Sequence, residues 1–166
     1  MNVWKKKPYA ILVFGAPMSG KTFFAEQFSQ SIRAPFLNIA RLEKKFGSDR
    51  KLADELITQM AKSKADLIIE GYINTEEQRK EMRELLKKLD YQPVLVWVQT
   101  DLNTIKQRMR NHYRKLDAAK EALAESYKHI EAPTADENPI VISGKHTFRT
   151  QCQNVVSRLN IKDVEL

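Results

Sequence analysis

A glycine-rich stretch near the N-terminus has the residue types needed to hold phosphate groups. Residues 15–22 read Gly-Ala-Pro-Met-Ser-Gly-Lys-Thr and directly follow a short apolar run. Gly15 and Gly20 allow a tight turn whose N–H groups can surround phosphate oxygens, while Lys21 can reach the β- and γ-phosphates and the Thr22 hydroxyl can bind Mg²⁺. We predict that this segment binds a nucleoside triphosphate through Gly15, Ala16, Pro17, Met18, Ser19, Gly20, Lys21, Thr22 and Phe23.

An acidic residue follows a second apolar run further along the chain. The run Asp-Leu-Ile-Ile-Glu ends at Glu70. An acid at the end of a buried parallel strand lies at the carboxyl edge of the sheet, where ligands bind in open α/β folds. Glu70 is therefore a candidate to hold the Mg²⁺ shell or to orient an acceptor, and the alternative is that it only caps the next turn.

A basic stretch over residues 106–115 could neutralise charge on a transferred phosphoryl group. Arg110 and Arg114 are four residues apart and share a helix face, whereas Arg108 lies on another face. Arginines stabilise the negative charge that spreads over the γ-phosphoryl oxygens during transfer. The stretch therefore predicts a mobile lid, and a solvated basic helix face is the alternative.

The rest of the chain alternates between short apolar runs and amphipathic segments. This alternation predicts an α/β fold with a parallel sheet covered by helices on both faces. Thr75 and Gln78 form a predicted capping box, and Asp101 is a predicted helix cap. The expected strands cover 9–14, 35–39, 66–70, 93–98 and 139–143, and the expected helices cover 21–32, 49–64, 75–89, 102–115, 118–130 and 147–159.

Composition narrows the class of protein. The 166 residues suit a single domain with its own core, and the net charge of +7 suits an anionic partner, nucleic acid included, although solubility alone also explains it. Cys152 is the only cysteine, so no intrachain disulfide can form, and we expect it in the core of a cytoplasmic protein. We find no secretion signal and no apolar run long enough to span a membrane.

With these motifs in place, the chain resembles the small P-loop kinases, a group that includes nucleoside, nucleotide, shikimate-type and polynucleotide-kinase-like proteins. The resemblance runs from about Tyr9 to Leu159 and rests on GAPMSGKT, ADLIIEG, LNTIKQRMR and PIVISGKHT. It implies a three-layer αβα fold with strand order 2-3-1-4-5, a helical lid at about 108–132, and ATP with Mg²⁺ as cofactors. It also implies phosphate contacts from Arg108, Arg110 and Arg114, and adenine contacts from Gly144, Lys145 and His146.

The second expected strand departs from the polynucleotide-kinase pattern. The stretch Phe-Leu-Asn-Ile-Ala-Arg-Leu-Glu resembles the segment that carries the base in that family, but Leu42 occupies the base position and Glu43 follows it. Either Glu43 or Glu70 serves as the base, or the acceptor differs. Arg41 is kept and could hold an acceptor phosphate, or it forms a surface ion pair.

These residues together predict a kinase with Lys21, Glu70, Arg108, Arg114 and Glu43 as catalytic residues and Thr22 and Glu70 as the metal site. The acceptor could be a nucleoside, a nucleotide, a polynucleotide end or a sugar derivative. An ATPase or nucleotide switch that acts on a partner is the first alternative, and a nucleic-acid-binding module is the second. A full AAA-type motor is disfavoured, because the chain leaves no room for the helical subdomain of those motors.

Overall fold

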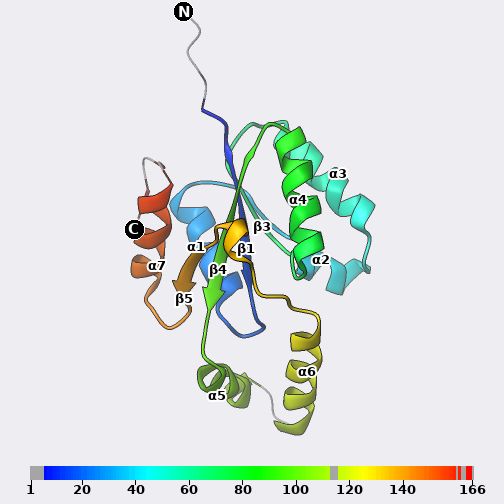
Figure 1. Ribbon diagram of the computed structural model, residues 1–166, viewed down its shortest axis with the longest axis vertical. Helices are drawn as coiled ribbons and strands as arrows, with labels where there is room; N and C mark the ends of the chain where they lie inside the picture. Colours follow the sequence, from blue (N-terminus) through cyan, green and yellow to red (C-terminus); the bar gives the residue numbers. More distant parts are fainter. Residues whose placement is uncertain (1–5, 113–115, 160, 162–163, 166) are drawn as a thin grey trace, which may run out of the picture.

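A computed structural model describes residues 6–112, 116–159, 161 and 164–165, and it contains one parallel sheet flanked by helices (Figure 1). The strands are β1 (Tyr9–Gly15), β2 (Phe36–Asn38), β3 (Leu67–Glu70), β4 (Gln92–Gln99) and β5 (Ile140–Ser143). The helices are α1 (Lys21–Ser31), α2 (Ile39–Phe46), α3 (Arg50–Ala61), α4 (Glu76–Lys88), α5 (Leu102–His112), α6 (Leu116–Lys128) and α7 (Phe148–Arg158), with a 3₁₀ helix η1 (Ala135–Glu137). The strand order β2-β3-β1-β4-β5 confirms the predicted fold class.

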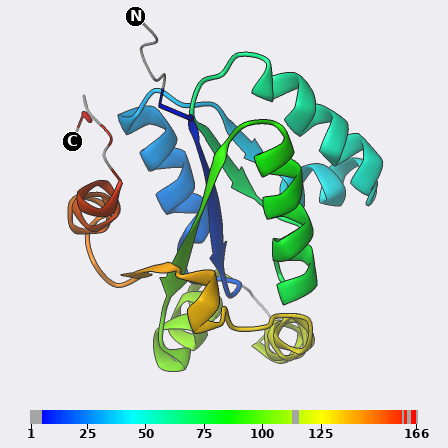
Figure 2. The same ribbon diagram turned by 45° about the horizontal axis from the view of Figure 1, so that its top comes forward.

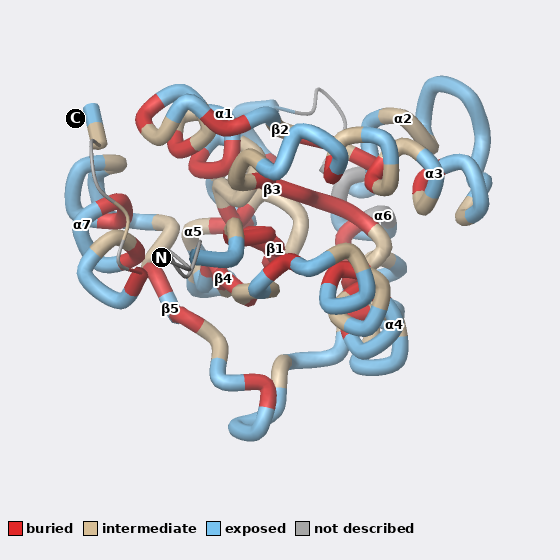
Figure 3. Tube along the Cα trace, turned by 90° about the horizontal axis from the view of Figure 1, so that it is seen from above, coloured by how far each residue is buried: buried red, intermediate tan, exposed pale blue. Residues whose placement is uncertain are grey.

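The alternation of side chains along β1 builds the two layers that cover the sheet. Ile11 and Val13 face a cluster that includes α1 and α7, whereas Leu12 and Phe14 face a cluster that includes α2, α3 and α4. Because both faces are covered, all seven residues of β1 are buried. Figure 3 shows the buried strands between helices whose outer sides are exposed. This burial explains why the strand is apolar throughout.

Helices α5 and α6 form a separate unit beyond the carboxyl ends of β1 and β4 (Figures 1 and 2). The two helices share a small core of Ile105, Met109 and Leu123, and Ala16 and Met18 of the glycine-rich loop pack against it. Asp101 caps α5 as predicted, because its carboxylate accepts a hydrogen bond from the Thr104 N–H at 2.9 Å. The helix pair is therefore coupled directly to the loop.

Most predicted elements are confirmed, and the capping box of Thr75 and Gln78 is present in α4. Helix α2 was not predicted, since its eight residues contain no long apolar repeat and its start depends on the Asn38 side chain, which accepts the Arg41 N–H. Helix α3 buries Ala53, Ile57 and Ala61, whereas Leu52 is exposed.

The segment between α6 and β5 contains η1. Trp97 in β4 is half-buried, packs against Phe14 and lines a cavity of about 670 Å³. In the part of the chain that the structure describes, no helix is both long and apolar enough to cross a membrane.

Candidate active site

The glycine-rich loop connects β1 to α1 and is shaped by close packing. A Cβ atom on Gly15 would lie 2.7 Å from the Ser19 hydroxyl oxygen and equally close to the Val98 carbonyl oxygen, so only glycine fits there. Gly20 has φ of 98°, a left-handed conformation that glycine adopts without strain, and it is the N-cap of α1. The exposed N–H groups at the start of α1 therefore point into the loop, as anion binding requires.

Lys21, Thr22 and Glu70 meet where the loop passes the end of β3. The Thr22 hydroxyl donates a hydrogen bond of 2.8 Å to Glu70 Oε1, and Lys21 Nζ donates one of 3.3 Å to the Ala16 carbonyl oxygen. The second Glu70 oxygen, Oε2, is buried and has no hydrogen-bond partner among the described residues. Buried polar atoms are nearly always paired, so an unpaired carboxylate oxygen here indicates a site for a ligand.

Burial shifts the acid–base behaviour of this site. Desolvation raises the pKa of Glu70 above its ordinary value, while the positive charge of Lys21 and the Thr22 hydrogen bond oppose that rise. Desolvation likewise lowers the pKa of Lys21, and the Glu70 charge opposes that shift. Ionisable groups in a cleft whose pKa values are shifted by burial and by a nearby charge are candidates for functional residues. An incoming polyphosphate would favour the charged form of Lys21.

The donor set fits Mg²⁺. Thr22 and Glu70 supply a hydroxyl and a carboxylate oxygen, which are the hard ligands that this ion prefers, and Mg²⁺ commonly takes its other ligands from water and substrate phosphates. No cluster of three or more His, Cys, Asp or Glu side chains that could hold a metal occurs among the described residues. A site completed by nucleotide phosphates is therefore the arrangement that these residues support.

One pocket of about 510 Å³ lies on the α7 side of the loop, and we call it the nucleotide-side pocket. It is bounded by the loop, Arg108 and the β5–α7 connection. Arg108 Nη1 donates to the Met18 carbonyl oxygen at 2.9 Å and Nη2 donates to the Gly144 carbonyl oxygen at 2.7 Å. Lys145 and His146 also line this pocket. The structure thus brings together most of the residues predicted to bind the nucleotide.

A second pocket of about 340 Å³ lies on the other side of Lys21, and we call it the acceptor-side pocket. Glu43 from α2, Glu70 and Tyr72 line it, and the C-terminal end of α6 closes one side. The Ser48 hydroxyl donates to a Glu43 carboxylate oxygen at 2.7 Å and lies 2.6 Å from the Tyr72 hydroxyl oxygen. Lys21 lines both pockets, so it marks their junction.

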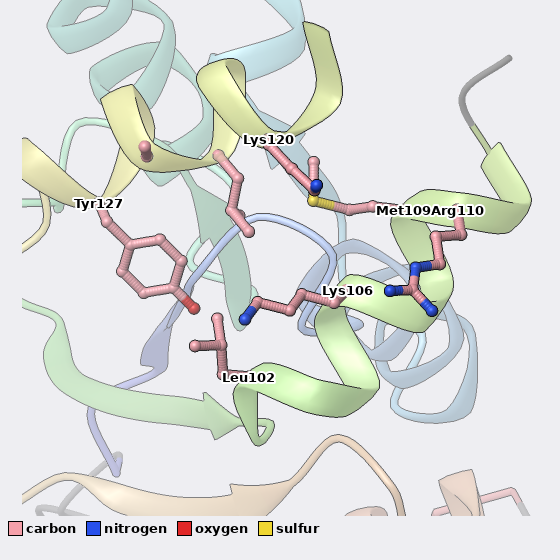
Figure 4. A pocket seen from close by; sticks show the side chains of 8 residues that line it. Leu102, Lys106, Met109, Arg110, Lys120 and Tyr127 are labelled. Carbon is pink, nitrogen blue, oxygen red and sulfur yellow. The ribbon is translucent and has the colours of Figure 1, made fainter. Parts of the chain in front are cut away.

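Two of the predicted residues, Arg110 and Arg41, lie outside both pockets. Arg110 lines a separate apolar pocket of about 250 Å³ between α5 and α6, shown in Figure 4 together with Lys106 and Tyr127, so its nucleotide contact stays a prediction. Arg114 falls outside the described residues. Arg41 is exposed and is not among the residues that line the acceptor-side pocket.

Sequence reasoning missed a buried ion pair behind the acceptor-side pocket. Arg79 Nε and Nη2 donate to the two carboxylate oxygens of Glu137 at 2.7 and 2.9 Å. The remaining nitrogen, Nη1, donates to the carbonyl oxygens of Ile73, Asn74 and Glu131. Arg79 thereby ties the segment that leaves α6 to the wall of the pocket. In the sequence, Arg79 is one of many charged residues of α4, so nothing there marks it as buried.

The fold and the loop define a P-loop protein of the kinase-like type. Residues 11–133 match a family model described as an AAA domain, so the chain belongs to that AAA-domain family. A comparison with curated protein sequences finds no significant match.

Solved structures share this architecture at low sequence identity. A sugar kinase from Janibacter sp. HTCC2649, solved without ligand, has a TM-score of 0.69 at 17% identity, covering 95% of this chain and 97% of that one. The APS kinase of Mycobacterium tuberculosis, in complex with AMPPNP and APS, has a TM-score of 0.68 at 16% identity over 93% and 98%. Kti12 from Chaetomium thermophilum, in complex with ADP-AlF3, has a TM-score of 0.70 at 13% identity over 95% and 100%. At these identities the likeness establishes the fold.

Proposed function

We propose that the chain is an ATP-dependent phosphotransferase that moves the γ-phosphoryl group of ATP to a hydroxyl group of a small acceptor. The observation that carries this proposal is the pair of pockets that meet at Lys21. A protein that only hydrolyses ATP needs a nucleotide pocket and room for water. The second pocket, which is lined by two carboxylates, gives an acceptor a place to bind next to Lys21.

The residues divide between the two substrates. Lys21 and Arg108 neutralise charge on the phosphates, and the P-loop N–H groups hold them in place. Thr22 and Glu70 would hold Mg²⁺, which would supply positive charge to offset that of the phosphates. Glu43, which lies in the acceptor-side pocket, orients the acceptor hydroxyl and takes up its proton. The predicted adenine contacts of Gly144, Lys145 and His146 belong to the nucleotide side.

The transfer is an in-line displacement. The acceptor oxygen forms a bond to the γ-phosphorus as the bond from that phosphorus to the β–γ bridging oxygen breaks. ADP leaves with the bridging oxygen, and the acceptor proton passes to the Glu43 carboxylate. The bound nucleotides in the APS kinase and Kti12 structures support ATP as the donor in proteins of this fold.

The test uses γ-labelled ATP with Mg²⁺ and a pool of acceptors that includes sugars, nucleosides, nucleotides and a 5′-hydroxyl oligonucleotide. Wild type is compared with Lys21→Met and with a control, Lys87→Met, which changes an exposed lysine at the end of α4. We expect label in an acceptor with wild type and control, and loss of about 100-fold or more in Lys21→Met.

The opposite result is equally clear. If wild type releases label only as free phosphate, and Lys21→Met abolishes that release, the chain is an ATPase or nucleotide switch that acts on a partner. Circular dichroism of each variant establishes that the fold is intact.

A second pair of variants, Glu43→Gln and Glu70→Gln, separates the role in acceptor binding from the role in Mg-ATP binding. We expect Glu43→Gln to change the kinetic parameters of the acceptor and Glu70→Gln to change those of Mg-ATP.

A further inference from the structure

The charges of the acceptor-side pocket restrict what can enter it. Two carboxylates, Glu43 and Glu70, line the pocket, and Lys21 is the only lysine or arginine among its described lining residues, which also include His129. Under the proposed function Lys21 is engaged by the phosphates of ATP. The His129 ring, just past the end of α6, lies 3.3 Å from a carboxylate oxygen of Glu125 in that helix. A negatively charged acceptor therefore meets two acids and a γ-phosphate.

Two arginines near this pocket have other partners, and Arg41, which follows the lining residue Ala40, is exposed and does not line the pocket. Arg50 forms an ion pair with Asp54 at 2.7 Å and lies over the Tyr72 ring, 5.3 Å from its centroid. Arg79 is buried and fully engaged by Glu137 and by backbone carbonyl oxygens. Neither guanidinium group can turn toward a phosphate without breaking these contacts. Like charges placed around a site are a common means of rejecting the wrong ligand.

The rest of the lining suits an uncharged molecule with several hydroxyl groups. Glu43 can accept hydrogen bonds from hydroxyl groups, and the Asn74 amide can both donate and accept. Pro17, Ile73 and Ile130 add apolar wall against which the C–H face of a sugar ring can pack. A volume of about 340 Å³ is at the small end of the range for ligand pockets.

From this lining we infer that the acceptor is a small, uncharged polyhydroxylated molecule, such as a free sugar or the sugar of a nucleoside, and that it carries no phosphate or carboxylate. This inference rests on the proposed function and narrows its substrate class. In the transfer step, one hydroxyl oxygen of this molecule bonds to the γ-phosphorus of ATP, ADP departs, and the hydroxyl proton moves to Glu43. Nucleotides and polynucleotide ends are thereby excluded as acceptors.

The test separates acceptors by charge before their identity is known. A small-molecule cell extract is passed over an anion exchanger, and the unbound and bound fractions are each incubated with the protein, γ-labelled ATP and Mg²⁺. Matched pairs are run beside them: glucose with glucose 6-phosphate, ribose with ribose 5-phosphate, and adenosine with AMP. We expect label to enter a molecule of the unbound fraction. For any labelled pair, we expect kcat/KM to be at least about tenfold higher for the neutral member.

Each other outcome has one meaning. Label in the bound fraction alone, or in the phosphorylated member of a pair alone, overturns this inference and leaves the kinase proposal standing. Phosphate release with no label in either fraction overturns the kinase proposal, and this inference falls with it.

Asn74→Arg, which adds a cation to the pocket wall, should lower the neutral-to-charged ratio of kcat/KM about tenfold, whereas the control Asn74→Gln should leave the ratio unchanged. An unchanged ratio in Asn74→Arg counts against charge as the basis of selection.

Discussion

Two buried glutamates of this molecule have pKa values that are shifted in opposite directions. Desolvation raises the pKa of Glu70. Desolvation also acts on Glu137, but hydrogen bonds from Arg79 and the Thr134 N–H, together with the charges of Arg79 and Arg83, outweigh it and lower that pKa. Both side chains are almost completely buried, so burial alone does not explain the difference.

The difference lies in the partners. Both oxygens of Glu137 accept hydrogen bonds from protein groups, whereas Glu70 keeps one oxygen without a partner. A fully paired buried charge holds one segment of chain against another. A buried charge that lacks some of its partners lowers the stability of the folded protein until a ligand supplies the missing contacts. The comparison therefore separates an architectural ion pair from the candidate functional site.

The largest expected effect comes from breaking the architectural pair. Arg79→Met should lower the free energy of unfolding by about 3–5 kcal/mol, because it leaves the Glu137 carboxylate buried without its main partner. Urea unfolding followed by circular dichroism measures the change. The control Arg158→Met, at an exposed position near the end of α7, should shift the value by less than about 0.5 kcal/mol. Equal, small shifts in both variants would contradict the architectural role.

On the functional side, Arg108→Met should lower kcat/KM for ATP by about 100-fold. Arg108 lies between the P-loop and the β5–α7 connection, and its charge is placed to neutralise phosphates. Steady-state kinetics with varied Mg-ATP measure the effect, and Arg158→Met again serves as the control. An unchanged kcat/KM for ATP would place Arg108 among the purely structural residues.

Glu70 offers a test in which activity and stability move in opposite directions. Glu70→Gln should weaken Mg-ATP use and yet raise the free energy of unfolding of the nucleotide-free protein by about 1 kcal/mol at pH 7, because it removes a buried charge that lacks a full set of partners. Differential scanning calorimetry with and without Mg-ATP measures both. A nucleotide-free variant less stable than wild type would show that Glu70 is architectural.

The pH dependence of that stability difference follows from the sign of each shift. The pKa of Glu70 is raised in the folded protein, so its contribution to stability is present below the ordinary value of 4.5 and is lost as pH rises through the folded pKa. The advantage of Glu70→Gln should therefore grow as pH rises above 4.5. The pKa of Glu137 is lowered, so its contribution is present above 4.5 and is lost as pH falls through the folded pKa. Thermal midpoints of wild type, Glu70→Gln and Glu137→Gln measured across pH give the two opposite trends.

The sequence allowed the residues of the candidate site to be located much better than those of the ion pair. The residues of the P-loop are adjacent in the chain, and their spacing alone specifies the turn and the helix that follows. Glu70 could be placed because a buried apolar run ends at it. The five apolar runs, read as buried strands, predicted the α/β fold class in the same way, and the resemblance to P-loop kinases supplied the strand order.

The ion pair of Arg79 and Glu137 could not be predicted, since its members are 58 residues apart and each looks like a surface residue. Arg79 occurs among Lys80, Glu81 and other charged residues of α4, and nothing in that pattern marks it as buried. The two residues pair only because the segment after α6, which carries Glu137, folds back against α4. The same holds for the acceptor-side pocket, which residues from β1, α2, β3 and α6 form only once the sheet and the helix pair are assembled.

The smallest effect is expected at Arg83, a third and more exposed residue that also pairs with Glu137. Arg83 Nη2 donates to Glu137 at 2.7 Å, but its side chain is 23% exposed, so Arg83→Met should cost only about 0.5–1 kcal/mol in urea unfolding. In the Arg79→Met background, Arg83 becomes the sole arginine paired with Glu137, and the same substitution should cost about 2 kcal/mol. That non-additivity is the signature of one shared buried charge. Equal costs in the two backgrounds would mean that Arg83 acts as an independent surface contact and that Arg79 alone holds Glu137.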